Sequence, residues 1–204
     1  MPCSFEQEQV LANRGISPVA GIDEAGRGPL AGPVVAAAVV FSEWYAPAGL
    51  DDSKKLTPRK RNSLYEEIIL MPSVRWAVAV LDNREVDQLN ILRATHQAMR
   101  EAFLSLDPHP VHALIDGLFV RDFPCGQTAI VKGDSLSLSI AAASVLAKVT
   151  RDRIMDELDR LHPEYEFSRN KGYPTARHLE LLNKYGPCPV HRRSYAPVAQ
   201  ASLL

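Results

Sequence analysis

Residues 19–41 contain two apolar segments joined by a short glycine-rich loop, and this arrangement leaves few choices for the fold. Val19–Asp23 predicts a first strand, and Glu24 follows it directly. Pro33–Phe41 is a continuous apolar run bounded by turn residues, which is typical of a strand buried on both faces. Because the loop between them is too short for a crossover helix, the two strands predict an antiparallel hairpin.

Further strands and helices alternate along the chain. Val74–Leu81 predicts a third strand from its β-branched and aromatic residues. Ala113–Gly117 and Ala129–Asp134 predict two more strands, each of which stops at an acidic residue. Apolar side chains at helical spacing predict one amphipathic helix over Asn83–Leu106. The positions in this pattern are Val86, Leu89, Leu92, His96, Met99 and Phe103.

The C-terminal third is expected to be mainly helical. An alanine-rich helix is predicted from near Ser135 to about Leu161, and a short helix from a Thr175 cap to Tyr185. A length of 204 residues allows one large or two small domains, of which we favour one. The expected fold is α/β: a mixed sheet that opens with the hairpin and is flanked by helices. Residues 163–204 would form a small helical and loop appendage.

Three of the predicted strands end in carboxylates: Asp23 with Glu24, then Asp116, then Asp134. Strand ends in open sheets gather at one rim, where ligands bind. Each acid also has an ordinary explanation, because Asp116 suits a turn and Asp134 suits a helix N-cap. If four acids do meet, each raises the pKa of the others unless a positive charge intervenes. The hard cations Mg²⁺ and Mn²⁺ suit such oxygen ligands.

Two such ions about 4 Å apart form the arrangement that promotes phosphodiester hydrolysis, with water attacking in line. One ion would activate the water and the other would stabilise the departing oxygen. Histidine-based catalysis or metal binding is not indicated, because the histidines are dispersed and match no metal-binding pattern. These residues are His96, His109, His112, His162, His178 and His191.

The cysteines and the N-terminus predict the cellular location. Cys3, Cys125 and Cys188 are odd in number and lack C-x-x-C spacing, so neither a disulfide framework nor a zinc site is indicated. Met1–Asn13 lacks the basic and apolar regions of an export signal, and no run of 18 apolar residues occurs. We therefore expect a cytoplasmic protein without a membrane span.

Charge is distributed unevenly, although the formal net charge is only −1. Residues 167–204 contain six basic residues and one acidic residue, a net charge of +5, so the preceding residues carry −6. A charge run of this kind is commonly just a solvated face. If the acidic part holds metal ions, however, the basic part suits a phosphate backbone.

The loop after Glu24 matches a nucleotide-binding motif only in part. Gly26–Ala31 fits G-x-G-x-x-A after a strand, but the dinucleotide-binding fingerprint needs a helix directly afterwards. Gly32, Pro33 and a β-branched run follow instead, and no G-x-x-x-x-G-K-[ST] motif occurs. We interpret the glycines as exposing main-chain groups to a sugar-phosphate, with Arg27 as a nearby charge.

Seven motifs follow one another over nearly the whole chain. They are D-E-A-G-R-G-P-L-A-G-P at 23–33, D-S-K-K-L-T at 52–57, I-D-G at 115–117, K-G-D at 132–134, I-A-A-A-S-V-L-A-K-V-T-R-D at 140–152, K-G-Y at 171–173 and H-R-R-S at 191–194. No single motif is specific, but together they closely resemble ribonuclease HII. A slight departure is Tyr195, where the family pattern leads us to expect Phe.

The resemblance implies a ribonuclease H-like fold and endonucleolytic cleavage of RNA in RNA–DNA hybrids. Single ribonucleotides embedded in duplex DNA would also be cut, leaving a 3′-hydroxyl and a 5′-phosphate. The backbone of Gly26, Arg27 and Gly28 would read the 2′-hydroxyl, and Tyr173 would sense the RNA-to-DNA junction. The implied catalytic and metal-binding set is Asp23, Glu24, Asp116 and Asp134, with two Mn²⁺ or Mg²⁺ ions when substrate is bound.

Basic residues near these motifs are candidates for phosphate contacts, which position a duplex without reading its sequence. They are Lys54, Lys55, Lys171, Arg192 and Arg193. The expected partner is nucleic acid, no protein partner is identified, and a monomer is expected. Two alternatives stay open: a non-catalytic module that binds hybrids, and a metal-dependent nuclease of other specificity. Four acids argue against the first, because a binding module gains nothing from anionic groups that face phosphates.

Overall fold

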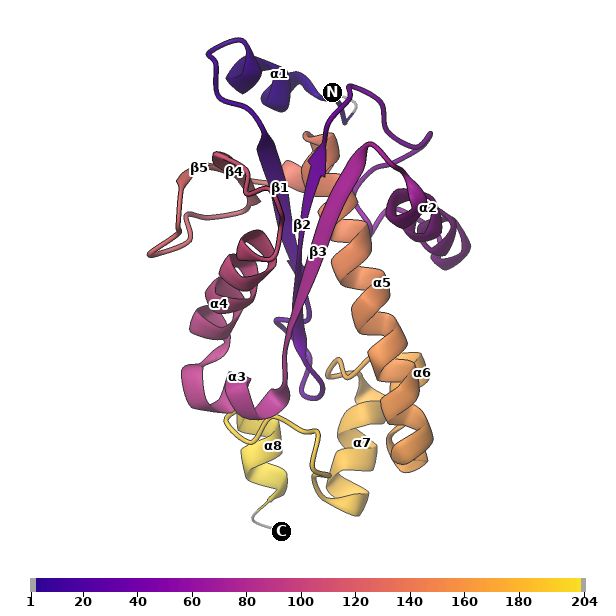
Figure 1. Cartoon of the computed structure of the whole chain (residues 1–204). Coiled ribbons are helices and arrows are strands. Elements are labelled where there is room, and N and C mark those ends of the chain that lie inside the picture. The colour runs from indigo at the N-terminus through magenta and orange to yellow at the C-terminus, as the bar shows by residue number, and fades with distance from the viewer. Residues whose placement is uncertain (1–2, 203–204) are drawn as a thin grey trace.

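The computed structural model describes residues 3–202. A five-stranded mixed sheet forms its centre, in the order β3-β2-β1-β4-β5, and helices lie on both faces (Figure 1). The α/β class predicted from the sequence is therefore confirmed. None of the helices in this part of the chain combines the length and the apolar composition needed to cross a bilayer.

The sheet opens with the predicted hairpin. β1 (Val19–Ala25) pairs antiparallel with β2 (Val34–Phe41), which in turn pairs antiparallel with β3 (Val74–Leu81). On the other side, β4 (His112–Asp116) runs parallel to β1, and β5 (Gly126–Ile130) runs parallel to β4. The carboxyl ends of β1 and β4 therefore lie side by side.

Helices bury both faces of β2. On one face lie α3 (Asn83–Leu89) and α4 (Ile91–Leu104), and on the other lie α2 (Pro58–Leu70) and α5 (Leu138–Leu161) (Figure 1). Even-numbered residues of β2 enter the core beneath α4, and odd-numbered residues enter the core beneath α5. The strand is apolar throughout because its side chains enter a core on each face.

Small residues let α5 approach the sheet closely. Ala141–Ala143 are fully buried against β2. In β1, a Cβ atom at Gly21 would lie only 2.1 Å from the carbonyl carbon of Ser139, so no larger residue fits there. This contact places the first turns of α5 directly beside the carboxylate-bearing end of β1.

The single helix predicted over residues 83–106 is wrong, because the segment forms two helices. Asn90 separates them with a φ of +67° and a ψ of 159°, a backbone conformation that few residues other than glycine adopt. Its side chain accepts a hydrogen bond from the Arg93 backbone N–H and so begins α4. The break shifts the apolar stripe, and Leu92, which the pattern placed on the buried face, is 51% exposed.

Four α-helices of the described residues have no counterpart among the sequence predictions: α1 (Glu6–Ala12), α2, α6 (Phe167–Asn170) and α8 (Ala196–Ala201). A signal for α2 was present in the sequence. The Thr57 hydroxyl caps this helix by accepting a hydrogen bond from the Lys60 N–H, and Pro58 takes the first helical position.

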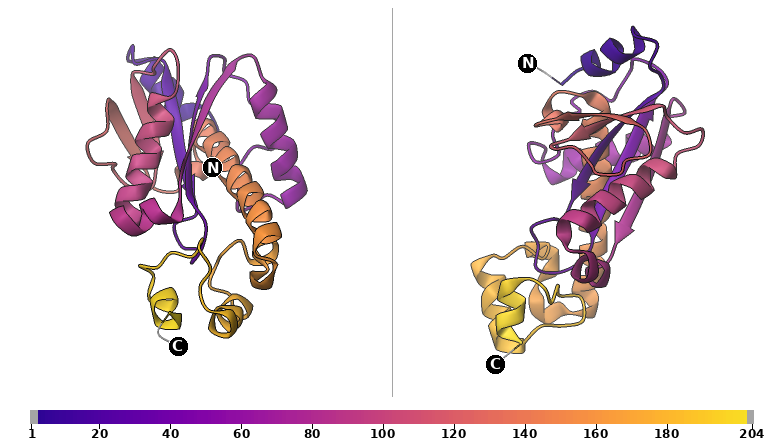
Figure 2. Two further views of the ribbon diagram at one scale, coloured as in Figure 1. Left: turned by 60° about the horizontal axis from the view of Figure 1, so that its bottom comes forward. Right: turned by 90° about the vertical axis from the view of Figure 1, so that its left-hand side faces the viewer.

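The C-terminal residues gather at one end of the sheet (Figure 2). Thr175 caps α7 by accepting a hydrogen bond from the His178 N–H, and Gly186, with a φ of +70°, ends it as predicted. Asn170, expected in a loop, instead ends a short helix. The elements of this segment are η2 (Pro163–Tyr165), α6 (Phe167–Asn170), α7 (Ala176–Tyr185) and α8.

Candidate active site

Three carboxylates from distant parts of the chain meet at the ends of β1 and β4. Oxygen atoms of Asp23, Asp116 and Asp134 all lie within 4.8 Å of one another. The parallel register pairs Ile22 with Ile115, which sets Asp23 beside Asp116. The backbone N–H of Asp134 lies 3.4 Å from Oδ1 of Asp116 as a hydrogen-bond donor. The fold therefore brings these three acids together.

Asp134 reaches the cluster by a different route from the predicted one. β5 ends at Ile130, and Lys132 has a left-handed φ of +58° that ends the extended chain. Asp134 lies beyond it on a 3₁₀ turn, η1 (Gly133–Ser135). The N-cap explanation is also wrong, because the Ser137 hydroxyl caps α5.

Glu24 lies beside the three aspartates rather than among them. Together with Asp23 and Asp116 it lines a cavity of about 250 Å³, and its Oε1 is 3.3 Å from Nη1 of Arg27. Burial raises the pKa of the Glu24 carboxyl, and the Arg27 charge partly offsets that rise. Glu24 is thus held at the cavity wall with its charge partly compensated.

Among these acids, Asp23 has the environment that most disfavours its charged form. Its side chain is 2% exposed, and only Oδ1 has a hydrogen bond to the backbone, from the Glu24 N–H at 2.7 Å. Within residues 3–202, Oδ2 is buried without a hydrogen-bond partner. Burial raises the pKa of Asp23 well above its ordinary value, and the charges of Glu24 and Asp116 raise it further; these effects outweigh the opposing ones of the nearby Ser144 hydroxyl and of the Glu24 N–H. A buried carboxylate in this state needs a cation.

A divalent metal ion fits this donor set. Burial and the Asp116 charge raise the pKa of Asp134, while Lys54, whose Nζ is 3.2 Å from Oδ2 of Asp134, offsets part of the rise. Burial alone would lower the pKa of Lys54, but Asp23 and Asp134 outweigh it and raise that pKa. A single exposed ammonium cannot neutralise three clustered aspartates, whereas hard oxygen ligands suit a divalent cation.

Two loops for which the sequence analysis predicts substrate recognition line the same cavity. Gly26, Arg27 and Gly28 form one wall, and Tyr173, which is 40% exposed, forms part of another. A Cβ atom at Gly28 would lie 3.7 Å from Cε1 of Tyr173, so the loops are in close proximity. The residues predicted to read the ribose and to sense the junction are therefore neighbours.

The cavity also contains residues that the sequence interpretation missed. Ser144 and Lys148, one turn apart on α5, line it together with Ser53. Burial lowers the pKa of Lys148, although an ion pair with Asp152 at 2.6 Å opposes this shift. Their spacing of four residues within the 140–152 motif placed both on one helix face and was the available signal.

Of the predicted phosphate contacts, that of Arg192 is wrong, and those of Lys55, Lys171 and Arg193 stay predictions. Arg192 is fully buried, and its guanidinium donates to backbone carbonyls of residues 26–32, so it cannot touch a phosphate. The Lys171 ammonium pairs with Asp156, and Lys55 pairs with Asp51 at 2.9 Å. The Arg193 guanidinium donates to Ser202 and to the carbonyl of Pro187. Lys54 is the residue of this group that lies at the cavity.

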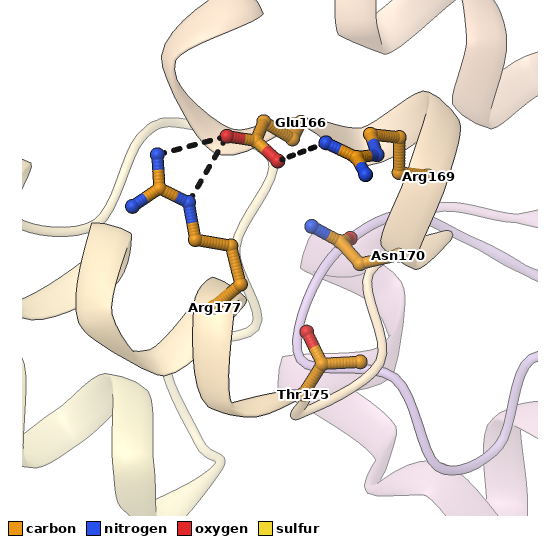
Figure 3. Close-up of a pocket in the computed structure, with 5 residues that line it drawn as sticks. All are labelled: Glu166, Arg169, Asn170, Thr175 and Arg177. Atoms are coloured by element: carbon orange, nitrogen blue, oxygen red, sulfur yellow. Dashed lines mark hydrogen bonds and ion pairs between the residues drawn. The ribbon is translucent and has the colours of Figure 1, made fainter.

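A larger cavity, of about 550 Å³, lies in the C-terminal segment (Figure 3). Arg177 donates two hydrogen bonds to Oε1 of Glu166 and one to Glu180, and Arg169 approaches Oε2 of Glu166 at 3.5 Å. The charged side chains of this cavity are therefore paired with one another. The Asn170 side chain donates to the Tyr165 carbonyl and accepts a hydrogen bond from the Gly172 N–H. We therefore place the active site at the carboxylate cavity.

Comparisons with known proteins agree with this assignment. A sequence model of the ribonuclease HII family matches residues 20–198. A ribonuclease HII of Caldanaerobacter subterraneus is 49% identical over 92% of this chain and 78% of its own length. The crystal structure of ribonuclease H2 from Pyrococcus horikoshii superposes with a TM-score of 0.77 at 28% identity, covering 91% of this chain and 97% of that one.

A further solved structure, of the PCNA:RNase HII complex from Archaeoglobus fulgidus, is similar with a TM-score of 0.73 at 28% identity. It covers 87% of this chain and 94% of that one. The ribonuclease H-like fold that the motifs implied is therefore confirmed, and both the family match and the relative extend over most of the chain. This chain belongs to the ribonuclease HII family.

Proposed function

We propose that this protein is a metal-dependent endonuclease that cuts the RNA strand of RNA–DNA hybrids and cuts duplex DNA at single ribonucleotides. The products carry a 3′-hydroxyl and a 5′-phosphate. The observation that carries the proposal is the convergence of Asp23, Asp116 and Asp134 beside the turn at residues 26–28. Membership of the ribonuclease HII family supports the same activity.

The metal-binding residues are Asp23, Asp116 and Asp134, with Glu24 at the edge of the same cavity. The unpartnered Oδ2 of Asp23 supports this assignment, because a buried anionic oxygen without a donor is costly. Two Mn²⁺ or Mg²⁺ ions would be held with substrate bound. When bound, such ions activate water and stabilise the charge on the departing oxygen.

The remaining cavity residues orient the substrate. Arg27, Lys54 and Lys148 place positive charge around the position of the scissile phosphate. The backbone at Gly26–Gly28 donates to the ribose 2′-hydroxyl, and Tyr173 packs on the next sugar. The C-terminal segment contacts the duplex beyond the cavity. A cytoplasmic monomer with nucleic acid as its partner stays a prediction.

Cleavage of a duplex that contains one ribonucleotide tests the proposal. With Mn²⁺ we expect one cut, at the ribonucleotide, no cut without metal, and recovery when metal is restored. Asp116→Asn should abolish the cut, whereas Asp122→Asn, at a position 84% exposed, should cut like wild type. An intact substrate that is bound without turnover would favour a binding module. Equal cutting of an all-DNA duplex would favour another nuclease specificity.

A further inference from the structure

Two buried arginines, Arg151 and Arg192, lie directly behind the turn at residues 26–28. Both side chains are fully buried. Their guanidinium hydrogen bonds end on backbone carbonyls, on the Tyr195 hydroxyl and on the Met155 sulfur, and none ends on a carboxylate of residues 3–202. Buried charges are ordinarily paired with an opposite charge. Two neighbouring cations without one are unusual enough to require a functional reason.

Arg192 holds the carbonyl groups of the turn toward the interior. Its Nη2 donates to the Gly26 carbonyl at 2.7 Å and its Nη1 to the Arg27 carbonyl at 3.2 Å, which the Tyr195 hydroxyl also contacts at 2.6 Å. In a trans peptide the following N–H points the opposite way. The N–H groups of Arg27 and Gly28 therefore point outward, and no acceptor within residues 3–202 is hydrogen-bonded to them.

Arg151 connects this turn to the loop that carries Tyr173. Its guanidinium donates to the Pro33 carbonyl at 2.9 Å, to the Ala31 carbonyl at 3.1 Å and to the Lys171 carbonyl at 3.0 Å. Its central carbon lies 5.9 Å from the centroid of the Tyr173 ring. One planar group thus spans both recognition loops.

The turn closes tightly on this arginine. A Cβ atom at Gly26, where φ is +100°, would lie 2.2 Å from Nε of Arg151, so only glycine fits. The Leu30 N–H also donates to the Gly172 carbonyl at 2.7 Å, a second direct link between the loops. The relative position of the two loops is therefore over-determined by hydrogen bonds.

We propose that Arg151 and Arg192 are positioning residues that hold the ribose-reading turn and Tyr173 as one unit, and that they thereby set the selectivity for an RNA-to-DNA junction. This inference rests on the proposed function. Neither arginine touches the substrate, because both are buried. They act through the outward N–H groups of the turn and through the placement of the Tyr173 ring.

The test is a ratio of two kcat/KM values, one for a duplex with a single ribonucleotide and one for a continuous RNA–DNA hybrid. Arg151→Lys keeps the charge, but one ammonium cannot replace a planar fork that spans three carbonyls. We expect the ratio to fall roughly tenfold, because misplacement by about 1 Å is enough for such an effect. The Mn²⁺ concentration that gives half-maximal activity should not change, since the variant leaves the aspartates in place.

A merely structural role predicts something different. Partial unfolding would lower both kcat/KM values equally and leave their ratio constant, and that outcome would overturn the proposal. Arg153→Lys is the matched control, because this exposed arginine two residues along α5 pairs with Glu66 and not with either loop. A wild-type enzyme that fails to cut at ribonucleotides would refute the proposed function, and this inference with it, whereas a cutting wild type with an unchanged ratio in Arg151→Lys would refute this inference alone.

A double-mutant cycle tests the route through Tyr173. In a Tyr173→Ala background, Arg151→Lys should lower the ratio less than it does in the wild type, because one of the two groups it positions is gone. Independent, multiplicative effects would contradict the proposal. Should Arg151→Lys not fold, Tyr195→Phe decides, since it removes only the hydroxyl that holds the Arg27 carbonyl. A fall of about threefold in the ratio is expected, because the variant loses two hydrogen bonds, one to the Arg27 carbonyl and one from Arg192, and an unchanged ratio would overturn the proposal.

Discussion

At the scale of single residues, the environment of the active-site carboxylates lowers the stability of the metal-free protein. Asp23 is buried, has an unpartnered Oδ2 and lies beside two other carboxylates. Each of these features raises the free energy of its charged form. Under the proposed function a bound cation reverses their effect, as in other functional sites where local stability is lower than it could be.

The Asp23→Asn variant should therefore change activity and stability in opposite directions. We expect cleavage to fall about a hundredfold or more, because a metal ligand is lost. In EDTA, the free energy of unfolding should rise by about 1–2 kcal/mol, because a buried charge without a partner is removed. Denaturant unfolding and single-turnover cleavage measure the two effects. Asp122→Asn should change neither, and a less stable metal-free Asp23→Asn protein would contradict the electrostatic argument.

At the scale of elements, two histidines help to pack the C-terminal segment together. Nε2 of His178, on α7, lies 3.1 Å from Nε2 of His191, and the aromatic rings of Tyr165 and Phe167 pack on His191. Burial lowers the pKa of His191 to about 3, and the neighbouring His178 adds to the shift. The sequence suggested dispersed histidines, whereas the fold pairs these two as neutral core residues.

This pair predicts that the protein loses stability in mild acid. The folded pKa of His191 lies below its unfolded value of about 6.5, so the unfolded chain takes up the proton first. Stability is complete above pH 6.5 and falls as the pH drops toward 3, by about 1.4 kcal/mol per pH unit. Unfolding in denaturant between pH 7.5 and 4.5 measures the slope. His191→Gln should flatten it and His109→Gln, in an exposed loop, should not; equal slopes would rule out this source.

At the scale of the whole molecule, surface charge is arranged differently from the expected basic tail. Lys171 and Arg192 of that tail are used in internal contacts. Basic side chains also line a groove of about 420 Å³ along α4, which contains Arg93, Arg100 and Arg121. Burial lowers the pKa of His96 in this groove, and the charges of Arg100 and Arg27 lower it further.

We expect affinity for duplex nucleic acid, measured in EDTA to prevent cleavage, to fall steeply with salt concentration. Each phosphate contact contributes a slope of about −0.9 in a plot of log affinity against log salt. Replacing both Arg93 and Arg100 by Gln should remove two such contacts and make the slope less negative by about 1.8. Arg14→Gln, in the turn after α1, serves as the control. A salt-independent affinity would exclude a binding mode based on phosphate contacts.

Local sequence patterns determined the hairpin, the doubly buried β2 and the placement of Asp116 at a strand end, because periodicity and loop length are encoded in neighbouring residues. The predicted end of the first strand at Asp23 is two residues too early, since β1 pairs with β2 as far as Ala25. The tertiary structure alone decided the break at Asn90, the route of Asp134 and the role of Arg192. The carbonyls that bind Arg192 lie more than 150 residues earlier in the chain. No local pattern distinguishes such a buried arginine from a surface one, since only folding reveals which acceptors surround its guanidinium.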